Sequence, residues 1–97
     1  MLSPTLLNNS VTLQWDANTD FIIGYRLYWG FLSRVYIFSV DVGNVTEFEI
    51  ENLEIGKYYF AVTAYNGFTE SNFSNEVSCE IELFSFQVST LHLSSDR

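Results

Sequence analysis

Three alternating oxygen-bearing residues form the first group that could support chemistry. Asp16, Asn18 and Asp20 have the spacing with which a calcium-binding loop begins. Such a loop also requires a glycine at its sixth position and a glutamate at its twelfth, where this sequence has Phe21 and Leu27. The segment therefore predicts a turn rather than a metal site.

Two further groups could be imagined as catalytic. Glu47, Glu49 and Glu51 alternate along one segment, and Cys79 and His92 are each unique in the chain. Paired carboxylates act as acid and base only where they lie in a cleft whose environment makes their two pKa values different. A cysteine nucleophile requires an orienting group and an electropositive pocket. We expect solvated glutamates on an open strand face and Cys79 as a small core residue. The sequence predicts no enzyme, no metal site and no cofactor.

Short alternating segments would position these side chains. Each segment places apolar residues on one side and ends at turn-forming residues, which is typical of half-buried strands. The predicted strands are residues 10–16, 21–29, 36–42, 46–50, 58–66 and 76–83. Their inward positions are Val11, Leu13, Trp15, Ile23, Tyr25, Leu27, Trp29, Phe48, Ile50, Tyr58, Phe60, Val62, Ala64, Val77, Cys79 and Ile81. This pattern predicts an all-β, antiparallel sandwich of two layers.

Composition narrows the function classes. The 97 residues suffice for one core, and 47% of them are hydrophobic. Four basic against twelve acidic residues give a net charge of −8, which disfavours nucleic-acid binding. No apolar run approaches the roughly 20 residues that span a bilayer, and residues 1–10 do not read as a signal peptide. We expect neither nucleic acid nor membrane insertion.

Several segments between residues 10 and 83 form an ordered set. They are Trp15 followed by Asp-Ala, the GYRLYWG segment 24–30, VDVG at 40–43, alternation from Tyr58 to Asn66, and FSNEV at 73–77. Together they resemble a fibronectin type III domain of the bacterial or phage-like kind. This resemblance implies a fibronectin type III-like (immunoglobulin-like) sandwich with Trp15 in the core. It also implies that Tyr58 buries its ring while its hydroxyl bonds the backbone near Leu53.

Both ends depart from that family. The segment before residue 10 is short, so the family's first strand should be short or missing, which exposes a sheet edge. Residues 84–93 alternate again and predict an extra strand that covers this edge or docks on a neighbouring chain, with a flexible tail as the alternative. We therefore divide the chain into a sandwich at 1–83 and an extension at 84–97.

An apolar stretch stands at residues 31–38, where relatives of this kind have polar residues. Exposed apolar surface often marks a contact site, although the loop could instead fold back over the sandwich or lie under the tail. The predicted partner-binding residues are Phe31, Leu32, Val35, Ile37, Phe38, Phe68, Phe84 and Phe86.

These observations predict a non-catalytic protein-interaction or structural module that binds a protein partner or itself. A small phage virion or assembly subunit, docking through its apolar loop and edge strand, fits this description, with a virion-surface or extracellular location. The alternative is a spacer or carbohydrate-associated accessory domain of a larger secreted bacterial protein, so carbohydrate also stays open as a partner.

Overall fold

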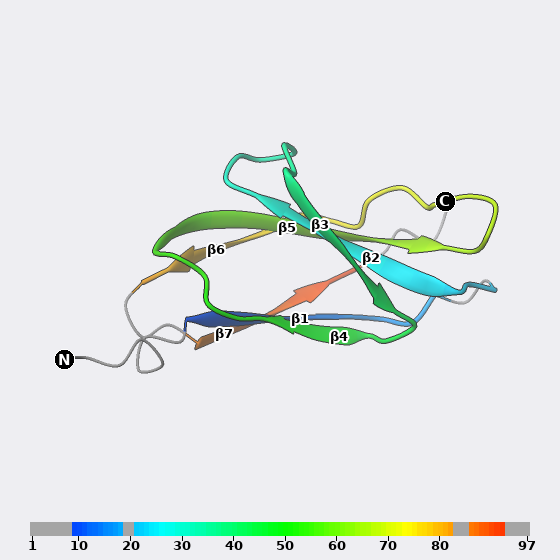
Figure 1. Ribbon diagram of the computed structural model, residues 1–97, viewed down its shortest axis with the longest axis horizontal. Coiled ribbons are helices and arrows are strands. Elements are labelled where there is room, and N and C mark those ends of the chain that lie inside the picture. The colour runs from blue at the N-terminus through cyan, green and yellow to red at the C-terminus, as the bar shows by residue number, and fades with distance from the viewer. Residues whose placement is uncertain (1–8, 19–20, 83–85, 93–97) are drawn as a thin grey trace.

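The computed structural model describes residues 9–18, 21–82 and 86–92, without the side chains of 86–89. Seven strands follow one another along the chain (Figure 1). They are β1 (Ser10–Trp15), β2 (Gly24–Gly30), β3 (Phe38–Gly43), β4 (Glu47–Ile50), β5 (Gly56–Tyr65), β6 (Val77–Ile81) and β7 (Phe86–Leu91). Among the described residues, no helix is long and apolar enough to cross a membrane.

The strands form two sheets that pack face to face as a β-sandwich (Figure 1). One sheet has the order β4-β1-β7, and the other has the order β3-β2-β5-β6. The expected all-β sandwich is confirmed. The proposed absence of a full first strand concerns residues before β1, and of these 1–8 lie outside the described part.

Side-chain alternation builds the core between the sheets. In β1, Val11, Leu13 and Trp15 are buried, as predicted, and Leu27 and Phe60 of the other sheet are fully buried opposite them. Burying such side chains contributes roughly 1.5–3 kcal/mol each, which makes this layer the main source of stability.

One inward assignment is wrong. Ile23 is 51% exposed, because β2 begins only at Gly24 and Ile23 lies at the end of the sheet, where only its amide pairs, with Tyr65 O at 2.8 Å. Phe21, placed in the same predicted strand, is 82% exposed. Strand alternation predicts a face only where the strand exists.

The expectation of a purely antiparallel sandwich is also wrong. The predicted C-terminal strand forms as β7, but it runs parallel to β1, with Ser10 opposite Phe86 and Trp15 opposite Leu91. β6 ends at Ile81, at the end of the sandwich where β1 starts, and β7 begins at that same end in the other sheet (Figure 1). Since β1 and β7 start from the same end, they must run in the same direction.

Candidate functional site

The chain between β5 and β6 covers an edge that would otherwise be open. β6 pairs only with the first half of β5. Beyond it, Ser71 N donates to Ala64 O at 2.7 Å and Ser74 N donates to Val62 O at 2.8 Å. In return, the Ser71 hydroxyl accepts a hydrogen bond from Ala64 N and the Ser74 hydroxyl accepts one from Val62 N, each at 2.9 Å. This irregular segment is thereby fixed along the sheet.

Glu70 joins that segment to the outer face of the sheet. Its carboxylate accepts hydrogen bonds from Arg26 Nη1 at 3.2 Å, from Thr63 Oγ1 at 2.5 Å and from the Tyr28 hydroxyl. Partial burial raises the pKa of Glu70, but these hydrogen bonds and the charge of Arg26 outweigh it and hold the pKa below its ordinary value. Glu70 is therefore a charged anchor at neutral pH.

Glu76 makes a second anchor, to the turn between β2 and β3. Its carboxylate accepts hydrogen bonds from Ser33 Oγ at 2.6 Å, Arg34 N at 2.8 Å and the Tyr36 hydroxyl at 2.6 Å. Arg34 has a φ of 66°, an uncommon conformation for a residue other than glycine. The pKa of Glu76 is lowered because these hydrogen bonds exceed the effect of its desolvation. The turn and the segment are held together through one carboxylate.

Three aromatic rings gather between the two anchors. The ring of Phe73 lies edge-on to Tyr28, with centroids 4.9 Å apart, and 5.1 Å from Tyr36. Phe73 keeps 43% of its surface exposed despite these contacts. An exposed aromatic surface therefore adjoins charged and amide groups, which suits a ligand with one apolar and one polar side.

Two cavities border this segment on either side, and both have residues 70–72 in their walls. The outer-face cavity, of about 490 Å³, is also lined by Tyr28, Arg34, Thr63 and Phe73. The end cavity, of about 320 Å³, is lined by Asn18, Phe21, Tyr65, Asn66 and Thr69 among others. Both are open depressions rather than enclosed cavities, and their volumes fall within the roughly 300–1,000 Å³ of small-molecule sites.

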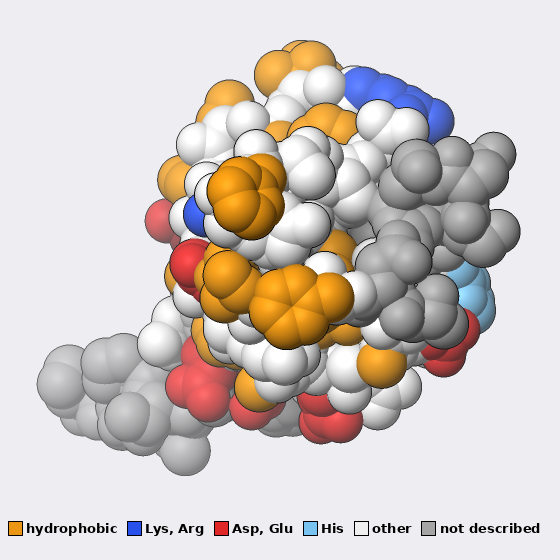
Figure 2. All heavy atoms as spheres, turned by 90° about the vertical axis from the view of Figure 1, so that its right-hand side faces the viewer, with side chains coloured by type: hydrophobic (Ala, Val, Ile, Leu, Met, Phe, Trp, Pro, Cys, Tyr) orange, Lys and Arg blue, Asp and Glu red, His pale blue; other side chains and the backbone are white. Residues whose placement is uncertain are grey.

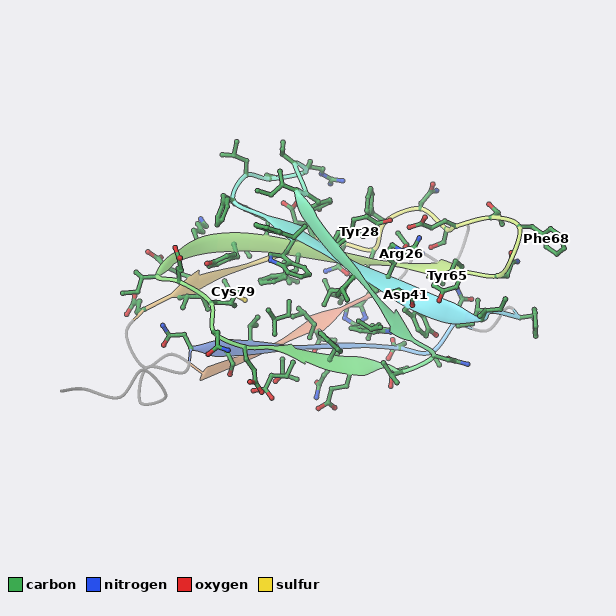
Figure 3. All side chains as sticks on the ribbon, viewed as in Figure 1. Arg26, Tyr28, Asp41, Tyr65, Phe68 and Cys79 are labelled. Atoms are coloured by element: carbon green, nitrogen blue, oxygen red, sulfur yellow. The ribbon has the colours of Figure 1, made fainter. Side chains whose placement is uncertain are left out.

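A network of side chains fixes the sheet between the cavities. Arg26 lies over the Tyr65 ring, 5.0 Å from its centroid, and the Tyr65 hydroxyl donates to Asp41 at 2.6 Å. Tyr28, Arg26 and Tyr65 follow one another from the middle of the molecule toward the end where Phe68 projects (Figure 3). Tyr28 and Tyr65 are thus positioned by strands, β2 and β5, rather than by loops.

The predicted apolar stretch forms an exposed turn. Exposed fractions are 50% for Phe31, 65% for Leu32, 49% for Val35, 60% for Ile37 and 42% for Phe38. A β-carbon on the residue before it, Gly30, would lie 2.2 Å from the carbonyl oxygen of Val35, so the turn needs glycine there. The predicted exposure of this stretch is confirmed, whereas its role in binding stays a prediction.

Among the described residues, the structure does not bring Phe68 to this turn. Phe68 is 99% exposed, but it follows β5 at the opposite end of β2, roughly 20 Å away along the strand. Figure 2 looks onto that end, where separate apolar side chains protrude. Phe84 lies outside the described residues, as does the side chain of Phe86, so neither can be placed on a common surface.

The groups considered for catalysis are dispersed. Cys79 is buried in the core, and His92 Nδ1 lies 3.5 Å from Asp16 Oδ2 in an exposed pair. Glu47 and Glu49 are exposed on β4. Within the described residues, no three His, Cys, Asp or Glu side chains gather as metal ligands would. Asp20, the third residue of the calcium-like spacing, lies outside the described part.

Sequence reasoning missed the segment that builds the cavities. Residues 69–76 have no strand or helix period, so nothing marked Glu70 or Phe73 as partners of β2. One signal was present: with Tyr25 and Leu27 facing inward, alternation puts Tyr28 on the outer face, where an aromatic residue calls for an explanation.

Comparison with known proteins finds a curated relative and similar solved structures. No family model matches the sequence. A Kelch domain-containing protein of Saccharolobus solfataricus is 40% identical over 76 residues, which cover 73% of this chain and 10% of that protein. The chain therefore corresponds to about a tenth of the length of this relative.

A similar fold is found among solved structures. A Bacteroides thetaiotaomicron protein (DUF1812), described as a proposed polysaccharide-binding protein, superposes with a TM-score of 0.56 at 14% identity. The alignment covers 86% of this chain and 45% of that one. Because identity is so low, this likeness concerns the fold alone.

Proposed function

We propose that this chain is a non-catalytic, fibronectin type III-like binding module of a longer protein, and that it binds polysaccharide through the cavities beside residues 70–72. The observation that carries the proposal is the placement of Tyr28 and Phe73 next to hydrogen-bonding groups in one cavity wall. Sugars offer an apolar face of C–H groups and a rim of hydroxyls, and this wall offers a complement to each.

Two features of the comparisons favour this proposal. The fold is shared with a proposed polysaccharide-binding protein, and the related sequence lies within a much longer chain. Both fit the accessory-domain alternative drawn from the sequence. Neither match supports the phage-virion hypothesis.

The test is retention of the purified chain on insoluble and soluble polysaccharides, with Phe73→Ala as the site variant. We expect the wild type to bind at least one polysaccharide and Phe73→Ala to lose about tenfold or more in affinity. Phe38→Ala is the matched control, since Phe38 is 42% exposed and also contacts two aromatic rings. Failure of the wild type to bind any polysaccharide would refute the proposal, and equal binding by both variants would place the site elsewhere.

A second candidate is self-association through the exposed turn. It is favoured by the exposed run from Phe31 to Phe38 and by its continuity with β3, the edge strand of its sheet. Light scattering of the wild type and of a Phe31→Ser, Leu32→Ser double variant tests it. A dimer that the double variant abolishes would support this candidate, and a monomeric wild type at high concentration would exclude it.

A further inference from the structure

The end cavity and the outer-face cavity share one wall. Glu70, Ser71 and Asn72 line both, so a ligand in one cavity lies against the same short segment as a ligand in the other. We infer that the two cavities together take one neutral glycan chain of at least two sugar units. This inference rests on the proposed function and specifies its ligand.

Aromatic residues occupy both cavities. Phe21, with 82% of its surface exposed, and Tyr65 line the end cavity, while Tyr28 and Phe73 line the outer-face cavity. Each cavity can therefore hold the apolar face of its own sugar ring. A single sugar could use only half of the aromatic surface, whereas a chain of linked units could use both parts at once.

Polar groups of the shared wall and of the end cavity suit sugar hydroxyls. Among the described residues, the side-chain amide of Asn72 and the hydroxyl of Thr69 have no hydrogen-bond partner, and the Asn66 amide uses only its oxygen, as acceptor for Phe68 N and Thr69 N. An amide offers both donors and an acceptor, and a sugar hydroxyl requires both. These groups can bind a glycan without disturbing the bonds that fix the segment.

The charges of the two cavities favour a neutral ligand. Glu70 belongs to both walls, and Arg34 is the single cation among the residues that line either cavity in the described part of the chain. Glu70 is itself paired with Arg26 at 3.2 Å, so the described lining of the end cavity offers no free cation, and the whole chain carries a net charge of −8. A uronate or sulfated chain would therefore find no cation to pair with in the end cavity, and it would meet the repulsive field of the whole chain.

The experiment is calorimetric titration with oligosaccharides of increasing length. The neutral probes are β-glucan, xylan and mannan oligosaccharides of about one to six units, and oligogalacturonates of the same lengths are the charged probes. For the neutral oligosaccharides derived from the polysaccharide that retains the chain, we expect the affinity to rise about tenfold or more from one unit to six. Oligogalacturonates should bind at least about tenfold more weakly than neutral oligosaccharides of the same length.

Variants in each cavity separate the outcomes. Phe21→Ala and Phe73→Ala should each abolish most of the gain with length, and Phe68→Ala is the control, because Phe68 is fully exposed at the same end but lines neither cavity. Equal affinity for one and six units would overturn the two-cavity chain while leaving polysaccharide binding intact. Tighter binding of oligogalacturonate would overturn the neutral class. Absence of all binding would instead refute the proposed function.

Discussion

At the scale of single residues, Tyr58 connects the core to the chain that enters β5. Its ring is buried, and its hydroxyl donates to the carbonyl oxygen of Glu54 at 2.9 Å. This arrangement agrees with the expectation of a buried Tyr58 bonded to backbone near Leu53. One side chain therefore satisfies a turn carbonyl and fills the space between the sheets.

Replacing Tyr58 with phenylalanine isolates the hydrogen bond. We expect Tyr58→Phe to lower the free energy of unfolding by about 0.5–1.5 kcal/mol, because the ring stays buried while Glu54 O loses its donor. Tyr59→Phe is the control, since Tyr59 makes no side-chain hydrogen bond among the described residues. Urea unfolding measures both, and equal losses would show that the Glu54 bond contributes nothing specific.

Residue-level prediction succeeded where a short period determined the outcome. Trp15 and Leu13 are buried because alternate positions of a real strand face the same way. Ile23 was misplaced because the start of β2 depends on its partner β5, which no local pattern encodes. The exposure of Phe31 and Leu32 was foreseen from the same alternation.

At the scale of elements, residues 69–76 take over the edge of β5 without being a strand. Ser74 carries out part of this role from a buried position: its hydroxyl accepts the Val62 amide at 2.9 Å and donates to Asn75 O at 2.8 Å. Where serine hydroxyls take the place of a strand's backbone hydrogen bonds, the sequence shows no alternation of apolar and polar residues. The site it builds could therefore not be derived from strand patterns.

Removing the Ser74 hydroxyl should leave the Val62 N–H buried without an acceptor. We expect Ser74→Ala to destabilise the fold by about 1–3 kcal/mol, as is usual for an unsatisfied buried donor. Ser78→Ala, on the exposed face of β6, should change stability by less than about 0.5 kcal/mol. Chemical denaturation compares them. A Ser74 variant as stable as the Ser78 variant would mean that another group, or water, satisfies Val62.

The two anchors of this segment make it sensitive to acid. Desolvation raises the pKa values of Glu70 and Glu76, yet their hydrogen bonds hold both below the ordinary 4.5. Groups with a lowered folded-state pKa stabilise the fold above their unfolded pKa, and this contribution is lost as the pH falls through the folded value. The stabilisation should be complete at neutral pH and decline below about pH 4.5.

A paired-variant measurement tests that dependence. In the wild type, the urea midpoint should be lower at about pH 3 than at about pH 6. In the double variant Glu70→Gln, Glu76→Gln, which cannot titrate at these positions, the difference between the two midpoints should be smaller. The double variant should also be less stable than the wild type at the higher pH, because a neutral amide is the weaker acceptor. Identical pH dependence in both proteins would show that other carboxylates control acid sensitivity.

At the scale of the whole molecule, β7 completes the smaller sheet. β1 would be an edge on the side away from β4, and β7 covers it with a parallel pairing along its full length. The sequence predicted a strand here from alternation, but its direction depends on where β6 ends and on the crossing to the other sheet. Chain topology, rather than local pattern, made that choice.

Leu91 offers a direct test that β7 belongs to the sandwich. Its side chain is fully buried in the core, whereas neighbouring Thr90 is exposed. We expect Leu91→Ala to cost about 2–5 kcal/mol in unfolding free energy and Thr90→Ala less than about 0.5 kcal/mol. Because a destabilised β7 would uncover the edge of β1, Leu91→Ala should also associate more readily in light scattering as its concentration rises. Wild-type stability in Leu91→Ala would contradict the docking of β7, since no truncation of a truly buried leucine leaves a packed core unchanged.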